Sequence, residues 1–446
     1  MIYLDLAEKL IFQIKSGEIA PGTQLPTHRA FAEEHGIALA TASRMYRILK
    51  QRGFIIGETG RGMFVRDPER PMTLGIEQVE KASQVDLVFN MPCDAEDGNI
   101  LRYGLRWLAK KGNLNEVLKY QPHGGVLSER KVLASYLSDR LGIIDPEHLF
   151  ITSGAQHGLS IATFGLLARG DIVAIDKLTY PGFLAAVGLC DLMLQSIPSS
   201  DDCMDPRALA EICEKGRIQA IYVIPTVHNP LGSVMGEALR RSIVEVARRH
   251  GLLIIEDGAY DFLEISPPPS FVQLAPERTV YVGGVSKILA TGLRVGYIVA
   301  PPDLASSIRM AIRATTWNTP AVLTSLVTHW ITDGTIHDFE VTRRNAGMKG
   351  QAICKEFLQG YAISAHPNAS FAWLWLPNGK RAEPIVARLA ELGIAVSSAE
   401  PYTVGHGTPN ALRIAFGGIE EKVFRFGLEK VRTVIEGAEN CGPVPN

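Results

Sequence analysis

The stretch Val282-Gly-Gly-Val-Ser-Lys-Ile-Leu-Ala-Thr-Gly-Leu-Arg-Val-Gly296 places one lysine, Lys287, among small and apolar residues. Poor solvation in such a setting disfavours the charged ammonium form, which suits an amine that forms a Schiff base with a carbonyl compound. Arg294 follows seven residues later and can act as a fixed cation for a nearby anion. The alternative interpretation of this stretch, taken alone, is a surface lysine and arginine where a strand meets a loop.

The length of 446 residues predicts two or three domains, at the usual ~100–200 residues per domain. Hydrophobic residues make up 46% and charged residues 21%, which indicates a globular protein with a sizeable core. Because the net charge is only −2, a nucleic-acid partner would need a local basic surface. The six cysteines form no C-x-x-C pair and no zinc-type cluster with histidine, so we expect reduced thiols and no metal site. No apolar run has the length of a membrane span and the N-terminus lacks a signal-peptide layout, so we expect a cytoplasmic protein without membrane association.

The first 66 residues have the pattern of a small DNA-binding domain. Helical spacing of apolar residues predicts three helices, over residues 3–16, 26–35 and 40–52. Thr27 is the expected N-cap of the second helix. Two short apolar runs around a glycine-rich turn predict a β-hairpin, or wing, over residues 54–56 and 63–65. Between residues 27 and 66, seven arginines and lysines face three glutamates, and this local excess of four positive charges suits contact with DNA.

Motifs in this region resemble the GntR-type winged helix, namely Leu25-Pro-Thr-His-Arg29, Thr41-Ala-Ser-Arg-Met-Tyr46, Gly53-Phe-Ile55 and Gly60-Arg-Gly-Met-Phe-Val65. The resemblance implies a recognition helix in the major groove and a wing tip in the minor groove. The DNA contacts that it implies are Arg29, Thr41, Ser43, Arg44, Arg47 and Arg61. This chain departs from the family at the start of the recognition helix, where a common polar pair is replaced by Ala38-Leu39. The alternative is a three-helix dimerisation cap whose arginines only solvate its surface.

Beyond the first domain, two prolines and a polar composition indicate an interdomain linker over residues 67–87. From residue 88, short apolar runs alternate with helical patterns, which predicts an α/β domain whose mostly parallel sheet is covered by helices on both faces. The predicted strands are 149–152, 172–175, 220–224, 252–255, 280–282 and 295–299. A smaller α+β subdomain is expected from about residue 320 within the domain 88–446. Ligands of such sheets bind beyond the carboxyl ends of the strands, so these ends are where we look for function.

Chemically useful residues follow five of these strands. They are the amine of Lys287, the carboxylate of Asp257, the phenol of Tyr260, the amide of Asn229, the aromatic ring of Tyr180 and the loop Ser153-Gly-Ala-Gln-His157, which leads into a helix. Pyridoxal phosphate needs such a set, because the amine holds its aldehyde and the carboxylate keeps its pyridine nitrogen protonated. The amide and the phenol can donate to its phenolic oxygen, and the ring can stack on it. The backbone N–H groups of Ala155 and Gln156, together with Arg294, can hold its phosphate. Each feature is common, but the whole set in this order predicts a site for pyridoxal 5′-phosphate.

Residues from about 88 to 435 resemble the fold-type I aminotransferases. The resemblance implies that Tyr120 reaches the phosphate bound by the partner subunit. It also implies that Arg413 clamps the α-carboxylate of a substrate, whereas the alternative is a strand-exposed arginine. The family usually has Ser or Thr three positions before the lysine, and this chain has Gly284, so Ser286 or Ser153 would have to supply that phosphate contact.

A GntR-type winged helix joined to an aminotransferase-like domain resembles the MocR (GabR/PdxR-like) family of bacterial regulators. The resemblance implies a transcription factor that binds promoter DNA and senses pyridoxal phosphate or a small amine or amino-acid effector. It also implies a head-to-tail homodimer in which each winged helix lies on the partner subunit, and such a dimer would bind two DNA half-sites. The first alternative is an active aminotransferase acting on amino acids and 2-oxo acids, in which Lys287 is catalytic and Arg413 binds substrate. The second is a structural DNA-binding protein with an inactive domain, which conflicts with retention of the complete cofactor set.

Overall fold

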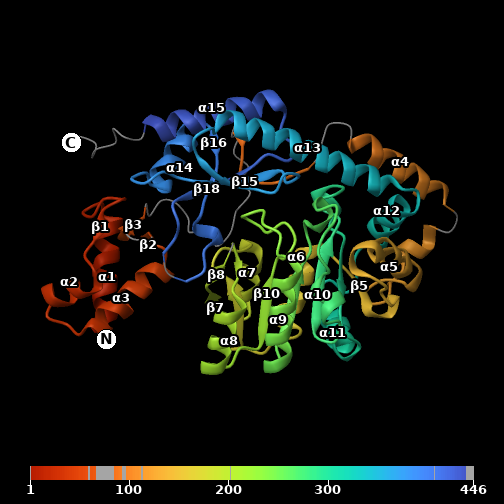
Figure 1. Cartoon of the computed structure of the whole chain (residues 1–446), viewed down its shortest axis with the longest axis horizontal. Helices are drawn as coiled ribbons and strands as arrows, with labels where there is room; N and C mark the ends of the chain where they lie inside the picture. Colours follow the sequence, from red (N-terminus) through yellow and green to blue (C-terminus); the bar gives the residue numbers. More distant parts are fainter. Residues whose placement is uncertain are drawn as a thin grey trace.

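The computed structural model describes residues 2–58, 61–66, 85–92, 97–111, 114–200, 202–405 and 407–437. Residues 67–84 of the predicted linker lie outside this described part, as do Thr59 and Gly60 at the predicted wing turn. An N-terminal unit, a large sheet-containing unit and a C-terminal unit follow one another along the chain (Figure 1). Over the described ranges, no helix combines the length and apolar character needed to cross a membrane.

The N-terminal unit contains three helices and a three-stranded sheet of order β1-β3-β2. Its elements are α1 (Ile2–Lys15), β1 (Gln24–Leu25), α2 (His28–Glu34), α3 (Leu39–Gln51), β2 (Ile55–Glu58) and β3 (Gly62–Val65). The predicted cap is confirmed, because the hydroxyl of Thr27 accepts a hydrogen bond from the amide of Ala30 at 3.2 Å. The three helices pack on one buried core that includes Met45 and Leu49. The predicted helices and hairpin are therefore present, and β1 is an additional strand that was not predicted.

The large unit is built on a seven-stranded sheet. In spatial order its strands are β5 (Leu149–Thr152), β13 (Gly296–Val299), β12 (Thr279–Gly284), β11 (Leu253–Asp257), β10 (Ala220–Val223), β6 (Ile172–Asp176) and β7 (Met193–Ile197). The strands from β12 to β7 are parallel, whereas β13 runs antiparallel to both β12 and β5. The mostly parallel sheet is thus confirmed. Because β13 is reversed, its first residue, Gly296, lies at the same edge as the carboxyl ends of the other strands.

Helices cover both faces of this sheet because its strands are apolar on both sides. One face packs against α6 (Ala155–Phe164), α7 (Pro181–Leu189) and α11 (Ala305–Thr315). The other face packs against α8 (Pro206–Lys215), α9 (Glu237–His250), α10 (Phe271–Leu274), α5 (Leu127–Leu141) and α12 (Ala321–Thr332). Helix α4 (Asp97–Lys110) lies against α12, far from the N-terminal unit (Figure 1).

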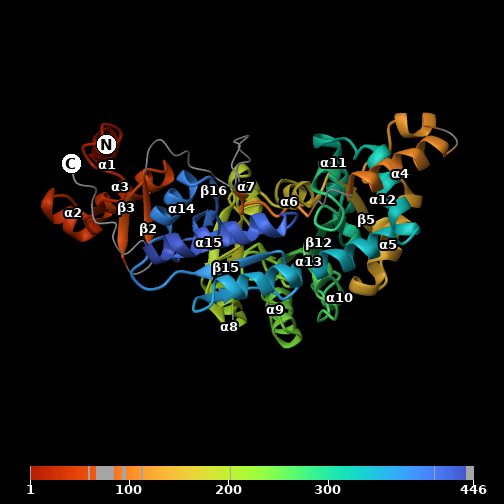
Figure 2. The ribbon, with the colours of Figure 1, turned by 90° about the horizontal axis from the view of Figure 1, so that it is seen from above.

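The C-terminal unit has a four-stranded antiparallel sheet of order β14-β15-β18-β17. Its strands are β14 (Ala362–Ser364), β15 (Phe371–Trp375), β18 (Ala411–Ala415) and β17 (Ser397–Ser398), and its helices are α13 (Thr335–Phe357), α14 (Ala382–Glu391) and α15 (Glu421–Gly437). Strand β4 (Val85–Asp86) pairs with β16 (Ile394–Ala395), so the last residues of the predicted linker pair with this unit. Arg381, the residue before α14, contacts Glu58 at the end of the wing strand β2, and both elements are on the same side of the molecule seen from above (Figure 2).

A close approach between β13 and the start of α6 requires glycine at position 296. A Cβ atom added to Gly296 would lie 2.6 Å from the amide nitrogen of Ala155, which is closer than non-bonded atoms tolerate. The reversed strand therefore sets the position of the first turn of α6 at the carboxyl edge of the sheet.

We expect Gly296→Ala to lower the free energy of unfolding by roughly 1–3 kcal/mol, because the added methyl group must displace backbone atoms. Gly292→Ala is the matched control, since nothing lies within 4 Å of its added Cβ. Thermal unfolding of both variants is the measurement. Equal midpoints for the two variants would contradict the close approach.

Candidate functional site

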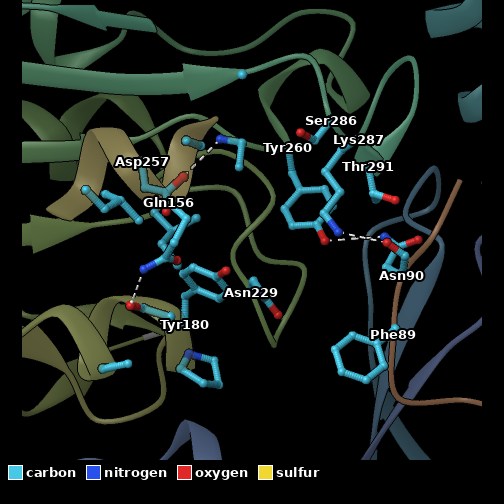
Figure 3. A pocket seen from close by; sticks show the side chains of 18 of the residues that line it. Phe89, Asn90, Gln156, Tyr180, Asn229, Asp257, Tyr260, Ser286, Lys287 and Thr291 are labelled. Atoms are coloured by element: carbon cyan, nitrogen blue, oxygen red, sulfur yellow. Dashed lines mark hydrogen bonds between the residues drawn. The ribbon is translucent and has the colours of Figure 1, made fainter. Parts of the chain in front are cut away.

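A cavity of about 550 Å³ lies between the carboxyl edge of the large sheet and the C-terminal unit. Its lining includes ten of the residues predicted to hold the cofactor or the substrate, namely Lys287, Asp257, Asn229, Tyr260, Tyr180, Ala155, Gln156, Ser286, Arg294 and Arg413. Figure 3 shows several of these side chains, among them Lys287, Asp257 and Tyr180. Tyr120 and Ser153, the alternative contact to the phosphate, are not among the lining residues. Most of these residues follow the ends of parallel strands, which bring them to one edge although they are far apart in the sequence. Arg294 instead precedes the reversed strand β13, and Arg413 lies within β18 of the C-terminal sheet.

The amine of Lys287 lies in the cavity next to the phenol of Tyr260. Its Nζ atom donates a hydrogen bond to the backbone oxygen of Asn90 at 2.7 Å and lies 5.9 Å from the centroid of the Tyr260 ring. The side-chain amide of Asn90 donates to the hydroxyl of Tyr260 at 3.3 Å (Figure 3). The lysine that follows β12 is thus close to the chain segment that follows β4.

Asp257 is the last residue of β11, and its carboxyl group is buried. The hydroxyl of Tyr222 donates to its Oδ2 at 2.7 Å, and the amide of Ala259 donates to its Oδ1 at 3.0 Å. Burial raises the pKa of Asp257 to about 6, although both hydrogen bonds favour the charged form. A cation beside this carboxyl group would stabilise its charged form, and a protonated pyridine nitrogen is such a cation.

The loop between β5 and α6 forms a cradle for an anion. Helix α6 begins at Ala155, within the stretch predicted to be a loop, so Ala155 and Gln156 are in its first turn. The guanidinium group of Arg294 reaches the same turn, because a Cβ added to Gly154 would lie 2.9 Å from its Nη2 atom. A helix N-terminus with an adjacent arginine fits a phosphate group.

Gly284 and Ser286 complete this cradle. A Cβ added to Gly284 would lie 3.3 Å from the amide nitrogen of Ala155, so a larger side chain there would press on the cradle. Within the described part of the chain, the buried hydroxyl of Ser286 finds no hydrogen-bond partner. An unsatisfied buried hydroxyl costs free energy, and a phosphate oxygen would satisfy it. The residues present therefore fit pyridoxal phosphate, with Ser286 in place of the hydroxyl that is missing at position 284.

Arg413 lies in β18 and is buried, so the alternative of a strand-exposed arginine is wrong. Its Nε donates to the Oδ1 of Asn229 at 3.1 Å, and its Nη1 donates to the backbone oxygen of Val88 at 3.2 Å. Its guanidinium group also lies 5.6 Å from the centroid of the Tyr402 ring. The arginine belongs to the C-terminal unit and the asparagine to the large unit, so this hydrogen bond joins the two walls of the cavity.

Tyr120 does not line the cavity of its own chain. The residue follows the short helix η1 (Leu114–Leu118) and is 85% exposed, with its ring 5.6 Å from that of Trp317. A contact with the phosphate of a partner subunit requires an exposed position of this kind, and that contact stays a prediction.

The residues predicted to contact DNA lie on the N-terminal unit, away from the cavity. Arg29, Arg44 and Arg47 are exposed on α2 and α3, whereas Thr41, Ser43 and Arg61 are partly exposed. The Oγ atom of Ser43 lies 3.2 Å from the Nδ1 of His28 in a hydrogen bond. At the start of α3, Leu39 is 48% exposed and Ala38 provides no side-chain cap, so this end presents an apolar surface.

Phe89, Asn90 and Tyr402 line the cavity and were not predicted, and neither was Tyr222, whose hydroxyl donates to Asp257. Tyr222 lies in the apolar strand β10. The sequence of this strand does not distinguish Tyr222 from residues that only pack in the core. Asn90 lies in an irregular segment after β4, and Tyr402 is the last residue of the short 3-10 helix η6 (Glu400–Tyr402). The pairing of β4 with β16 could have drawn attention to Asn90, but two residues per strand leave no readable pattern.

Comparison with known proteins identifies two families in this chain. The model of aminotransferase class I and II matches residues 84–430, and that of the gntR family of bacterial regulatory proteins matches residues 2–65. The HTH-type transcriptional regulator YdeF of Bacillus subtilis is 25% identical over 415 residues, which cover 93% of this chain and 90% of the relative. The 2-aminoadipate transaminase of Thermus thermophilus is 27% identical over 342 residues, which cover 74% and 84%.

Solved structures show the same fold for the larger part of the chain. The kynurenine aminotransferase of Pyrococcus horikoshii has a TM-score of 0.74 at 23% identity, and the match covers 84% of this chain and 98% of that one. The relative named as a regulator matches nearly the full length, whereas the transaminase matches about three quarters. This protein therefore belongs to the class I and II aminotransferase family, and it joins this domain to a GntR-type winged helix in one chain, a combination consistent with the MocR-like family.

Proposed function

We propose that this protein is a pyridoxal-phosphate-dependent transcriptional regulator. Its winged helix binds promoter DNA, and its cavity senses pyridoxal phosphate or a small amine or amino acid. The observation that carries this proposal is the presence, in one chain, of an exposed basic recognition helix and a cavity lined by Lys287, Asp257 and Arg413. Pyridoxal phosphate, when bound, supplies an aldehyde that captures amines and a ring that withdraws electrons.

Each cavity residue has a proposed task in holding this cofactor. Lys287 would hold the aldehyde carbon, Asp257 would keep a proton on the ring nitrogen, and Tyr180 would stack on the ring. The ring hydroxyl would be held by Asn229 and Tyr260, and the phosphate by Ala155, Gln156, Ser286 and Arg294. Arg413 would bind the carboxylate of an amino-acid effector, for which its planar guanidinium group is suited.

We also propose that the functional unit is a cytoplasmic homodimer in which Tyr120 completes the phosphate site of the partner subunit. Large apolar side chains are exposed next to it, with Leu118 at 81% exposure. Such exposed apolar groups suit burial against a second subunit. Two winged helices in one dimer would bind two DNA half-sites, as the symmetry of a dimer requires.

A working aminotransferase is the second candidate function, because the cavity retains Lys287 and Arg413 together. Absorbance spectra distinguish the two functions. Stable conversion of the bound cofactor to pyridoxamine phosphate by an amino acid, reversed by a 2-oxo acid, would favour the enzyme.

The first test is a gel shift on the DNA upstream of the protein's own gene, with and without pyridoxal phosphate and candidate amines. Ligand can change DNA affinity only through its differential binding to two states, which amounts to roughly 5–150-fold in typical cases. We expect Lys287→Ala to abolish this ligand-dependent change, and Lys131→Ala, an exposed residue of α5, to preserve it. Unchanged promoter binding and unchanged ligand response in Lys287→Ala would contradict the proposal.

The pH dependence of cofactor binding tests Asp257. A pKa raised to about 6 means that the carboxyl group loses its charge as the pH falls through this value, and with it the attraction for a protonated ring nitrogen. Affinity for pyridoxal phosphate should therefore fall on the acidic side of about pH 6. Asp257→Asn should bind roughly tenfold or more weakly at neutral pH, since it lacks a hydrogen bond to a charged partner. Fluorescence titration measures both affinities, and an identical pH profile in the variant would remove Asp257 from this role.

The exposed arginine Arg44 on α3 tests the DNA surface. We expect Arg44→Ala to remove one contact with a DNA phosphate, and this loss should reduce the slope of log affinity against log salt concentration by about 1. Arg52→Ala is the matched control, because Arg52 ends the same helix but forms an ion pair with Glu8. Equal salt dependence of Arg44→Ala, Arg52→Ala and the unmodified protein would exclude Arg44 from the contact.

A further inference from the structure

A short segment after β4 joins the two groups proposed to bind an amino acid. The Nη1 of Arg413 donates to the backbone oxygen of Val88 at 3.2 Å, and the Nζ of Lys287 donates to the backbone oxygen of Asn90 at 2.7 Å. A ligand whose carboxylate binds the arginine and whose amine reaches the position of the lysine amine would therefore lie along this segment. Phe89 is the residue between the two contacts, and it lines the cavity. The side chain of such a ligand would lie next to Phe89.

Hydrogen bonds fix the position of this segment. The Oδ1 of Asp86 accepts hydrogen bonds from the amide of Val88 at 2.8 Å and from the amide of Phe89 at 3.3 Å. The amide of Ala415, in β18, donates to the backbone oxygen of Leu87 at 2.7 Å. Strand β18, which also carries the arginine, therefore holds the segment in place, and the phenylalanine is a fixed part of the cavity wall.

Each charged side chain of the cavity has a partner in the proposed complex. Over the described part of the chain, the lining contains four charged side chains, those of Asp257, Arg294, Lys287 and Arg413. The cofactor would use the first three, through its ring nitrogen, its phosphate and its aldehyde. The two acceptors that Arg413 contacts are neutral oxygens, one of Asn229 and one of the backbone, so its positive charge is available for one α-carboxylate. A second charge on the ligand would find no partner among these lining residues.

The surroundings of Arg413 are aromatic. Its guanidinium group lies 4.7 Å from the centroid of the Phe371 ring and 5.6 Å from that of the Tyr402 ring. In Figure 3, Phe89 lies on the opposite side of the cavity from Asp257, away from the carboxyl group that would face the cofactor ring. A charge without a partner costs free energy in such surroundings, whereas an apolar side chain gains free energy from burial there.

We infer that the effector is an α-amino acid with an uncharged, apolar side chain, and that this side chain contacts Phe89. The inference rests on the proposed function and names the class of ligand that the cavity takes. Arg413 selects for the α-carboxylate, because it is a buried cation whose contacts within the protein are neutral. The wall beside it selects against a second carboxylate, because the cavity offers that carboxylate no second cation.

Binding of three amino acids of similar shape tests this selection in the full-length protein loaded with pyridoxal phosphate. The side chains of L-leucine, L-asparagine and L-aspartate branch at the same carbon atom, but the first is apolar, the second is polar and neutral, and the third is charged. Absorbance titration gives the three affinities. We expect L-leucine to bind most tightly and L-aspartate about tenfold or more weakly than L-leucine, because its side-chain charge would lack a partner.

The outcomes of this titration separate the inference from the proposed function. Binding of L-aspartate or L-asparagine that is as tight as that of L-leucine would overturn the inference and leave a sensor of amino acids standing. If the protein binds pyridoxal phosphate but responds to none of the three, amino-acid sensing itself is overturned, and the inference with it.

Phe89→Ala tests the contact with the side chain of the ligand. We expect this variant to bind L-leucine roughly tenfold more weakly and L-alanine less than about twofold more weakly, because the methyl group of L-alanine has little contact to lose. Phe426→Ala is the matched control, since Phe426 is exposed on α15 and does not line the cavity. An unchanged ratio of the two affinities in Phe89→Ala would overturn the contact.

Phe89→Lys supplies the cation that the wall lacks. We expect it to raise the affinity for L-aspartate relative to L-leucine by about tenfold, because the side-chain carboxylate gains a charged partner. A purely structural role of Phe89 would weaken the binding of both amino acids equally, and that result would overturn the inference.

Discussion

A carboxyl group buried at the end of a central strand is the constraint on which the cavity depends. Asp257 lies between two flanking parallel strands, where burial opposes its charge and two hydrogen bonds favour it. A protonated pyridine nitrogen beside Asp257 would stabilise the charged form of the carboxyl group. The flanking strands β10 and β12 lead to Asn229 and Lys287, so the groups that we propose to bind the opposite side of the same ring lie at the same edge. The order of the strands in the sheet therefore determines how far apart the residues of the cofactor site lie.

The strand ends could be predicted from sequence because apolar runs that are buried on both faces leave a clear pattern. The residues after these runs then converge, since parallel strands carry their carboxyl ends to one edge. Strand β7 was not predicted because it lies at the edge of the sheet and mixes polar with apolar residues. The reversal of β13 was also invisible in the sequence, yet Arg294 still reaches the cavity because the start of a reversed strand lies at that same edge.

Pairs that are distant in the chain could not be predicted. Glu58 and Arg381 are separated by 323 positions, and neither stands in a motif that marks a partner. Tyr222 and Asn90 have the same difficulty, because their roles come from hydrogen bonds to Asp257 and Tyr260 that only the folded chain creates. Arg413 was found through a family resemblance, and its burial follows from the neighbouring strands of the C-terminal sheet. Local pattern therefore reveals sites built at strand ends, whereas contacts between units require the tertiary structure.

The exposed position of Tyr120 has a consequence for how the protein would behave at different concentrations. In the proposed homodimer, each phosphate site is complete only when the second subunit contributes this tyrosine. Subunit association and cofactor retention are then linked equilibria, so each strengthens the other by mass action. Dilution would release cofactor as well as separate the subunits. The number of copies in a cell would therefore set the vitamer concentration at which the cavities fill.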